Sequence, residues 1–79
     1  MDWQDYIEVR PEVLVGKPVI KGTRISVELI LDRFADGWTM EDVLDAYPHL
    51  TRDQVLAALR FVAEIYKEDE FAAIGKASA

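Results

Sequence analysis

Apolar residues recur at helical spacing through the back two-thirds of the chain, from residue 26 to residue 66. Gly37 and Pro48 divide this stretch, because glycine commonly ends a helix and the residue before a proline avoids the α region. Residues that cap helix N-termini stand at the expected starts, namely Ser26, Thr39 and Thr51. The pattern therefore predicts three helices joined by short connections, the second short and the third long.

The first 25 residues have a different pattern, typical of extended backbone. Residues 6–10 alternate and are rich in β-formers, and Pro11 ends that stretch. Residues 19–20 and 23–25 are expected to be two short extended arms joined by a turn at Gly22, which supplies a positive φ. We predict a mainly α fold, a three-helix bundle of helix-turn-helix outline preceded by a short β arm or hairpin.

This pattern predicts one domain over residues 1–66, made of an extended β arm (1–25) and a three-helix core (26–66). We expect a C-terminal tail over residues 67–79, either helical or disordered. The chain has 79 residues, no cysteine and one histidine, which excludes disulfides and the usual structural zinc sites. A core this small gives a free energy of unfolding of roughly 3–5 kcal/mol, and domains of this size are usually stabilised further by disulfides, a metal ion or a second subunit. With 51% hydrophobic residues, we expect a homodimer.

The N-terminal arm is the predicted dimer interface. A strand over residues 6–9 is too short to stand alone, and pairing its edge across a two-fold axis would satisfy its backbone groups. The interface residues expected are Trp3, Tyr6, Ile7 and Val9. The alternative is a monomer whose arm folds back on its own helices.

Charge bears on the class of partner. The net charge is −6, which repels nucleic acid at long range. In a helix-turn-helix the third helix reads bases with its N-terminal residues, and arginine and glutamine are good readers. The candidate contacts are Lys17, Lys21, Arg24, Arg52 and Gln54. The alternative is a plain three-helix bundle. Absence of a signal peptide and of a membrane span favours a cytoplasmic protein.

A catalytic site is not indicated. His49 lies between the second and third predicted helices, where an exposed turn residue is the simpler interpretation, and no nucleophile is placed to pair with it. The Gly16-Lys17-Pro18 and Lys21-Gly22-Thr23 segments lack the spacing of a phosphate loop. We expect no enzyme activity, no cofactor and no metal.

The run Gly-Lys-Pro-Val-Ile-Lys-Gly-Thr-Arg-Ile at residues 16–25 resembles a known pattern, which continues in Asp36-Gly37-Trp38-Thr39, Tyr47-Pro48-His49-Leu50-Thr51 and Ala57-Ala58-Leu59. The chain is similar, over roughly residues 6–66, to the prokaryotic family called domain of unknown function 433. The resemblance implies a homeodomain-like or winged helix-turn-helix. It also implies an antitoxin-like role with a PIN-like ribonuclease toxin, and no catalytic residue. Arg24 is the motif residue that packing does not explain; an ion pair, a helix cap and a phosphate contact all stay open.

Two functions follow as hypotheses. The first is an antitoxin-like, non-catalytic binding protein of a toxin–antitoxin pair, whose helical part dimerises or contacts an operator. Its tail, with Phe71 and Ile74, then binds the toxin by folding on it. The second is a stand-alone DNA-binding transcriptional regulator. An enzyme is the third and weakest interpretation.

Overall fold

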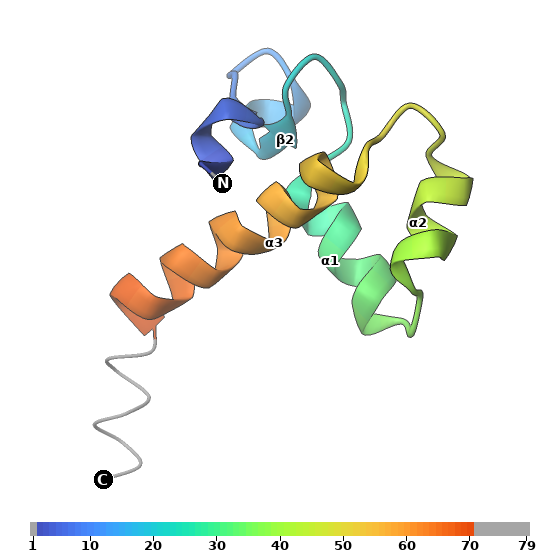
Figure 1. The fold of residues 1–79 in the computed structure, drawn as a ribbon. Helices are drawn as coiled ribbons and strands as arrows, with labels where there is room; N and C mark the ends of the chain where they lie inside the picture. The colour runs from blue at the N-terminus through green and yellow to red at the C-terminus, as the bar shows by residue number, and fades with distance from the viewer. Residues whose placement is uncertain (1, 71–79) are drawn as a thin grey trace, which may run out of the picture.

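The computed structural model describes residues 2–70 of the chain. Three helices follow a small N-terminal hairpin (Figure 1), and the order of elements fits the predicted mainly α class. The hairpin region contains two short 3-10 turns and two strands, η1 (Trp3–Asp5), β1 (Ile7–Val9), η2 (Leu14–Gly16) and β2 (Pro18–Ile20). The helices are α1 (Val27–Ala35), α2 (Met40–Ala46) and α3 (Arg52–Ile65), and a π turn, η3 (Tyr66–Glu70), continues α3.

The helices begin at the three residues that the sequence marks as caps. Ser26 Oγ accepts a hydrogen bond of 2.9 Å from the Leu29 amide. Thr39 and Thr51 each take part in a capping box, in which the side chain three residues later accepts from the cap residue's own amide. Because these bonds satisfy amides that a helix leaves unpaired, they fix the start of each helix locally.

The two strands pair with each other within the chain. β1 and β2 are antiparallel, with Ile7 opposite Ile20 and Val9 opposite Pro18. One edge of β1, the strand predicted to pair across a two-fold axis, is therefore occupied within the chain, and its pairing with a second copy stays a prediction. Residues 23–25, predicted as a second arm, contribute no strand; a bridge between Val19 and Ser26 closes that side instead.

The intervening segment makes this pairing possible. Leu14, Val15 and Gly16 all have positive φ and reverse the chain within one short turn. Val13, which precedes them, is buried and anchors the reversal. Three consecutive left-handed residues are hard to foresee from sequence, since such a conformation is costly for leucine and valine.

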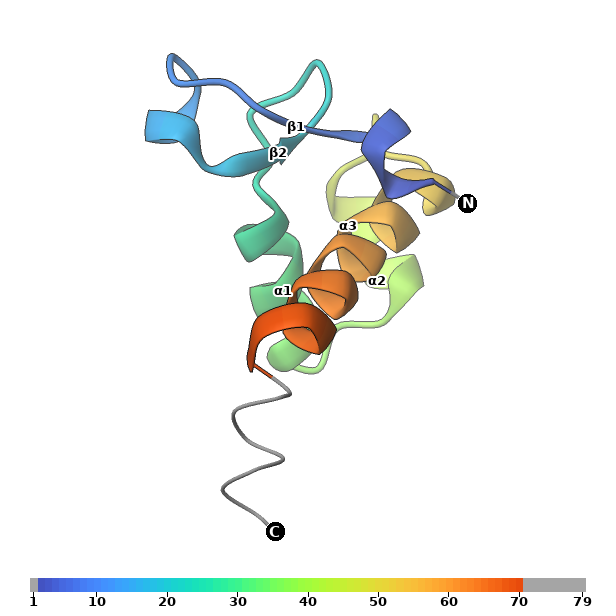
Figure 2. The ribbon, with the colours of Figure 1, turned by 90° about the vertical axis from the view of Figure 1, so that its left-hand side faces the viewer.

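The core lies where α3 crosses α1 beneath the hairpin (Figure 2). Its fully buried side chains come from β2, α1, α2 and α3, namely Val19, Ile20, Ile30, Val43 and Val55. Ala57 and Ala58 are also fully buried, and their small size lets neighbouring segments approach α3 closely. None of the helices within residues 2–70 is long and apolar enough to cross a membrane.

Candidate interaction surfaces

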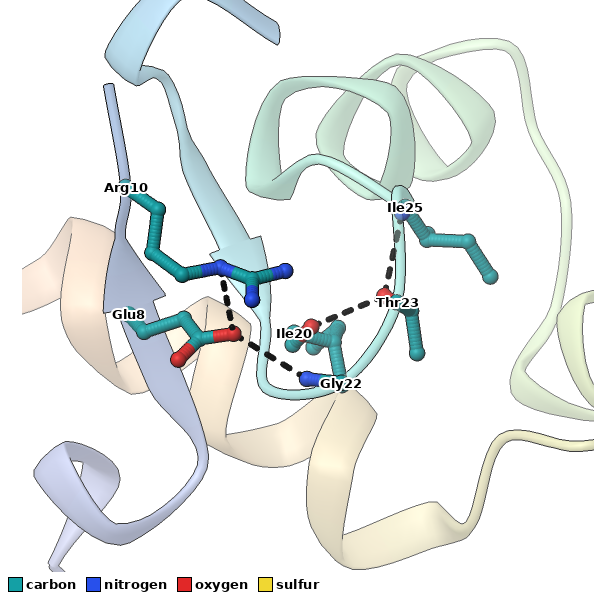
Figure 3. Close-up of polar contacts among 6 residues, drawn as sticks. All are labelled: Glu8, Arg10, Ile20, Gly22, Thr23 and Ile25. Atoms are coloured by element: carbon teal, nitrogen blue, oxygen red, sulfur yellow. Dashed lines mark hydrogen bonds and ion pairs between the residues drawn. The ribbon is translucent and has the colours of Figure 1, made fainter. Parts of the chain in front are cut away.

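The loop between β2 and α1 is held rigidly from inside (Figure 3). Thr23 Oγ1 donates a hydrogen bond of 2.8 Å to the Ile20 carbonyl and accepts one of 3.0 Å from the Ile25 amide. Gly22 has a φ of +76°, and its amide donates to the Glu8 carboxylate at 3.1 Å. The Gly-Thr pair of the motif is therefore structural: it shapes the turn that joins the hairpin to the helices.

Glu8 is a residue whose role the sequence did not reveal. Its side chain reaches across from β1, and Oε2 lies 3.3 Å from Arg10 Nε as well as accepting from the Gly22 amide (Figure 3). The carboxylate thus links β1 and the residue that follows it to the motif loop. The two partners, Glu8 and Gly22, are fourteen residues apart, so no local sequence pattern predicts their contact. It can be recognised only once β1 and β2 are paired.

The basic residues proposed for nucleic-acid contact differ in their availability. Lys17 Nζ donates a hydrogen bond of 2.8 Å to Glu28, which raises the lysine pKa and lowers that of the glutamate. Lys21 and Arg24 are exposed on the rigid loop. Arg24 makes no ion pair or side-chain hydrogen bond with residues 2–70, so neither structural role considered for it occurs there.

The two candidate base-reading residues of α3 are engaged elsewhere. Gln54 Oε1 accepts a hydrogen bond of 2.8 Å from the Thr51 amide, so its side chain belongs to the capping box. Arg52 is exposed, and its Nη2 lies 3.6 Å from a carboxylate oxygen of Glu41 on α2. Arg52, the one cationic residue in the first turn of α3, therefore lies beside the carboxylate of Glu41.

Three of the four proposed dimer residues of the N-terminal arm pack against this chain's own core. Trp3 contacts Phe61 of α3 edge to face, with ring centroids 4.8 Å apart. Tyr6 is half-buried against the core, and Ile7 is a core residue at 5% exposure, which corrects its assignment to an exposed interface. Val9 is exposed. Phe71 and Ile74, the proposed toxin-binding residues, lie outside the described residues.

Arg33 joins the end of α1 to the loop that follows α2. Its Nε donates to the Tyr47 hydroxyl at 3.4 Å, and its guanidinium lies 5.3 Å from the Trp38 ring centroid. The contact with Tyr47 raises the pKa of Arg33 further above its ordinary value. His49, in the same loop, is exposed. Within residues 2–70 no cluster of three acidic, histidine or cysteine side chains could hold a metal ion.

The outer face of α3 carries apolar residues that the core does not use. A groove of about 760 Å³ runs between α3 and the N-terminal turn, and it is lined by Asp2, Trp3, Leu56, Leu59, Arg60, Ala63 and Glu64. Leu59, at helical spacing from the buried Val55, lines this groove, whereas Phe61 packs inward on Trp3. The sequence could have indicated this, because residues 56, 59 and 63 form one apolar stripe along the helix and residues 55, 58 and 62 form a second one beside it.

A family model described as "Protein of unknown function (DUF433)" matches residues 7–62, from β1 to the later part of α3. The chain belongs to the DUF433 family. The match includes the hairpin, the Gly22-Thr23 loop and all three capped helices, which are the features that give this DUF433 chain its shape. The resemblance inferred from the motif run is thereby confirmed.

Two further proteins resemble this DUF433 chain. An uncharacterised protein, y4eO, from Sinorhizobium fredii is 31% identical over 65 residues, which are 82% of this chain and 27% of that protein. The chain thus spans about a quarter of that relative's length. A crystal structure of a DUF433 member from Anabaena variabilis has a TM-score of 0.72 and 25% identity, covering 96% of this chain and 71% of that one. That likeness confirms the three-helix fold with its hairpin.

Proposed function

We propose that this DUF433 chain is a non-catalytic binding protein, the antitoxin-like partner of a PIN-like ribonuclease. The observation that favours protein binding over DNA reading is the apolar outer face of α3, and the nuclease is the partner that the family resemblance implies. In a helix-turn-helix this face would enter the DNA major groove, where polar and cationic side chains read bases. Here it carries Leu56, Leu59 and Ala63 beside a groove, which favours a protein surface as its partner.

Electrostatics support a protein partner over DNA. The chain has a net charge of −6. Of the five residues considered for nucleic-acid contact, Lys17 is paired with Glu28, Arg52 lies beside Glu41 and Gln54 caps its own helix. Lys21 and Arg24 remain, and two phosphate contacts give little of the counterion release that drives DNA binding. A cytoplasmic site of action is part of the same proposal.

The nuclease is expected to bind the C-terminal segment that includes Phe71 and Ile74, which leaves the α3 face for another contact. The test is co-expression of the tagged chain with the product of any PIN-like nuclease gene adjacent to its own. We expect a co-purified complex and loss of ribonuclease activity, and we expect both to be abolished by Phe71→Asp with Ile74→Asp. The matched control is Lys21→Ala with Arg24→Ala, which leaves the complex intact.

The competing function, a stand-alone DNA-binding regulator, is separated by a gel shift on DNA upstream of the chain's own gene. We expect no specific shift at low salt. A shift that weakens steeply with salt and is lost on Lys21→Ala with Arg24→Ala would replace the antitoxin-like proposal with a regulator. Failure to co-purify with an adjacent nuclease would overturn the nuclease pairing directly.

A further inference from the structure

The second half of α3 lies beyond the body formed by the hairpin, α1 and α2 (Figure 1). Leu56, Leu59, Ala63 and Tyr66 follow one another at intervals of three, four and three, which is the seam spacing of paired helices. Leu56 is 38% exposed and Tyr66 43%. Apolar side chains so exposed on a projecting helix are typical of a surface that another helix covers.

We propose that this seam, Leu56, Leu59, Ala63 and Tyr66, pairs with the same seam of a second copy, the two α3 helices lying antiparallel. The inference takes from the proposed function only the premise that the α3 face binds protein, and it needs no nuclease. A two-fold axis midway along the seam sets Leu59 of one copy against Ala63 of the other, and Leu56 against Tyr66. Leu59 then meets the room that Ala63 leaves, Leu56 packs against the Tyr66 ring at each end of the seam, and the match repeats by symmetry.

Charge favours a second copy over an unrelated acidic or basic partner. Arg60 and Glu64 line the same groove, 3.8 Å apart in an exposed ion pair. Antiparallel pairing brings Arg60 of each copy near Glu64 of the other, so the face is complementary to itself. Elsewhere, at a net charge of −6, like charges oppose self-association. The α3 groove is therefore the part of the protein surface best suited to contact a second copy of the chain.

The experiment is sedimentation equilibrium of the full chain from low micromolar to about one hundred micromolar, with circular dichroism as the control for folding. We expect a monomer–dimer equilibrium. Ala63→Glu places one unpaired carboxylate per copy in the seam and should raise the dimer dissociation constant at least about tenfold, with the helix content unchanged. The matched control is Val15→Asn, which removes an apolar side chain that is 95% exposed but far from α3, and should leave the constant unchanged.

A charge swap tests the antiparallel arrangement. Arg60→Glu places like charges opposite each other and should weaken the dimer, as should Glu64→Arg. The double variant restores opposite charges and should recover most of the affinity, whereas loss of the exposed intrahelical pair alone leaves the protein folded. A monomer at every concentration overturns the proposal, and so does a dimer indifferent to Ala63→Glu. A monomer that still captures the nuclease leaves the proposed function standing without this inference.

Discussion

Replacing Thr23 tests whether the motif loop is structural. Thr23→Val keeps the side-chain shape but removes a donor to the Ile20 carbonyl at 2.8 Å and an acceptor for the Ile25 amide at 3.0 Å. The Ile20 carbonyl keeps its bond from the Thr23 amide, whereas the Ile25 amide loses the partner that the structure shows for it. A partly buried amide left unsatisfied costs about 1–3 kcal/mol, so we expect a loss of about 2 kcal/mol.

That loss is large for a chain of 79 residues. Small domains have a margin of roughly 3–5 kcal/mol, and a loss of this size lowers Tm by roughly 8–16 °C. Urea unfolding followed by circular dichroism, at one fixed low protein concentration, measures the free energy of unfolding. Thr23→Ser keeps both hydrogen bonds and should lose less than about 1 kcal/mol. A valine variant within about 0.5 kcal/mol of the native chain would refute this account of the motif.

Three further outcomes are expected. Val15→Asn should stabilise the fold by about 1 kcal/mol, because valine at a φ of +56° is strained and its side chain is exposed; an unchanged urea midpoint would contradict this. Trp3→Ala should cost about 2 kcal/mol, since half-buried Trp3 covers Phe61; a change in dimer affinity with no change in unfolding would return Trp3 to an interface. The hydrogen bond from Lys17 lowers the pKa of Glu28. The pair therefore stabilises the fold fully at pH values above the ordinary carboxyl pKa, and this stabilisation is lost as the pH falls through the lowered pKa of Glu28. Lys17→Met should return the pKa of Glu28 toward its ordinary value in a carbon NMR titration, and no change would exclude the pair.

The sequence by itself determined the helices. Ser26, Thr39 and Thr51 cap their own helices through bonds that span three residues, and Gly37 and Pro48 act on their immediate neighbours. Such signals are local, so the chain shows them in order without any knowledge of the fold. The motif run likewise indicated the family, because its residues stand together in the sequence, in β2 and the loop that follows it.

The tertiary structure decided the partners of the front third. β1 pairs with β2 across a reversal at Leu14 and Val15 that residue preferences disfavour, and Glu8 reaches Gly22 only because that pairing forms. Long-range packing also decided which face of α3 is buried. Leu56 and Leu59 have the same character as the buried residues beside them, and the position of the hairpin and α1 leaves them on the outside. Helical spacing shows that a helix has two apolar faces, but long-range packing selects which of them becomes core.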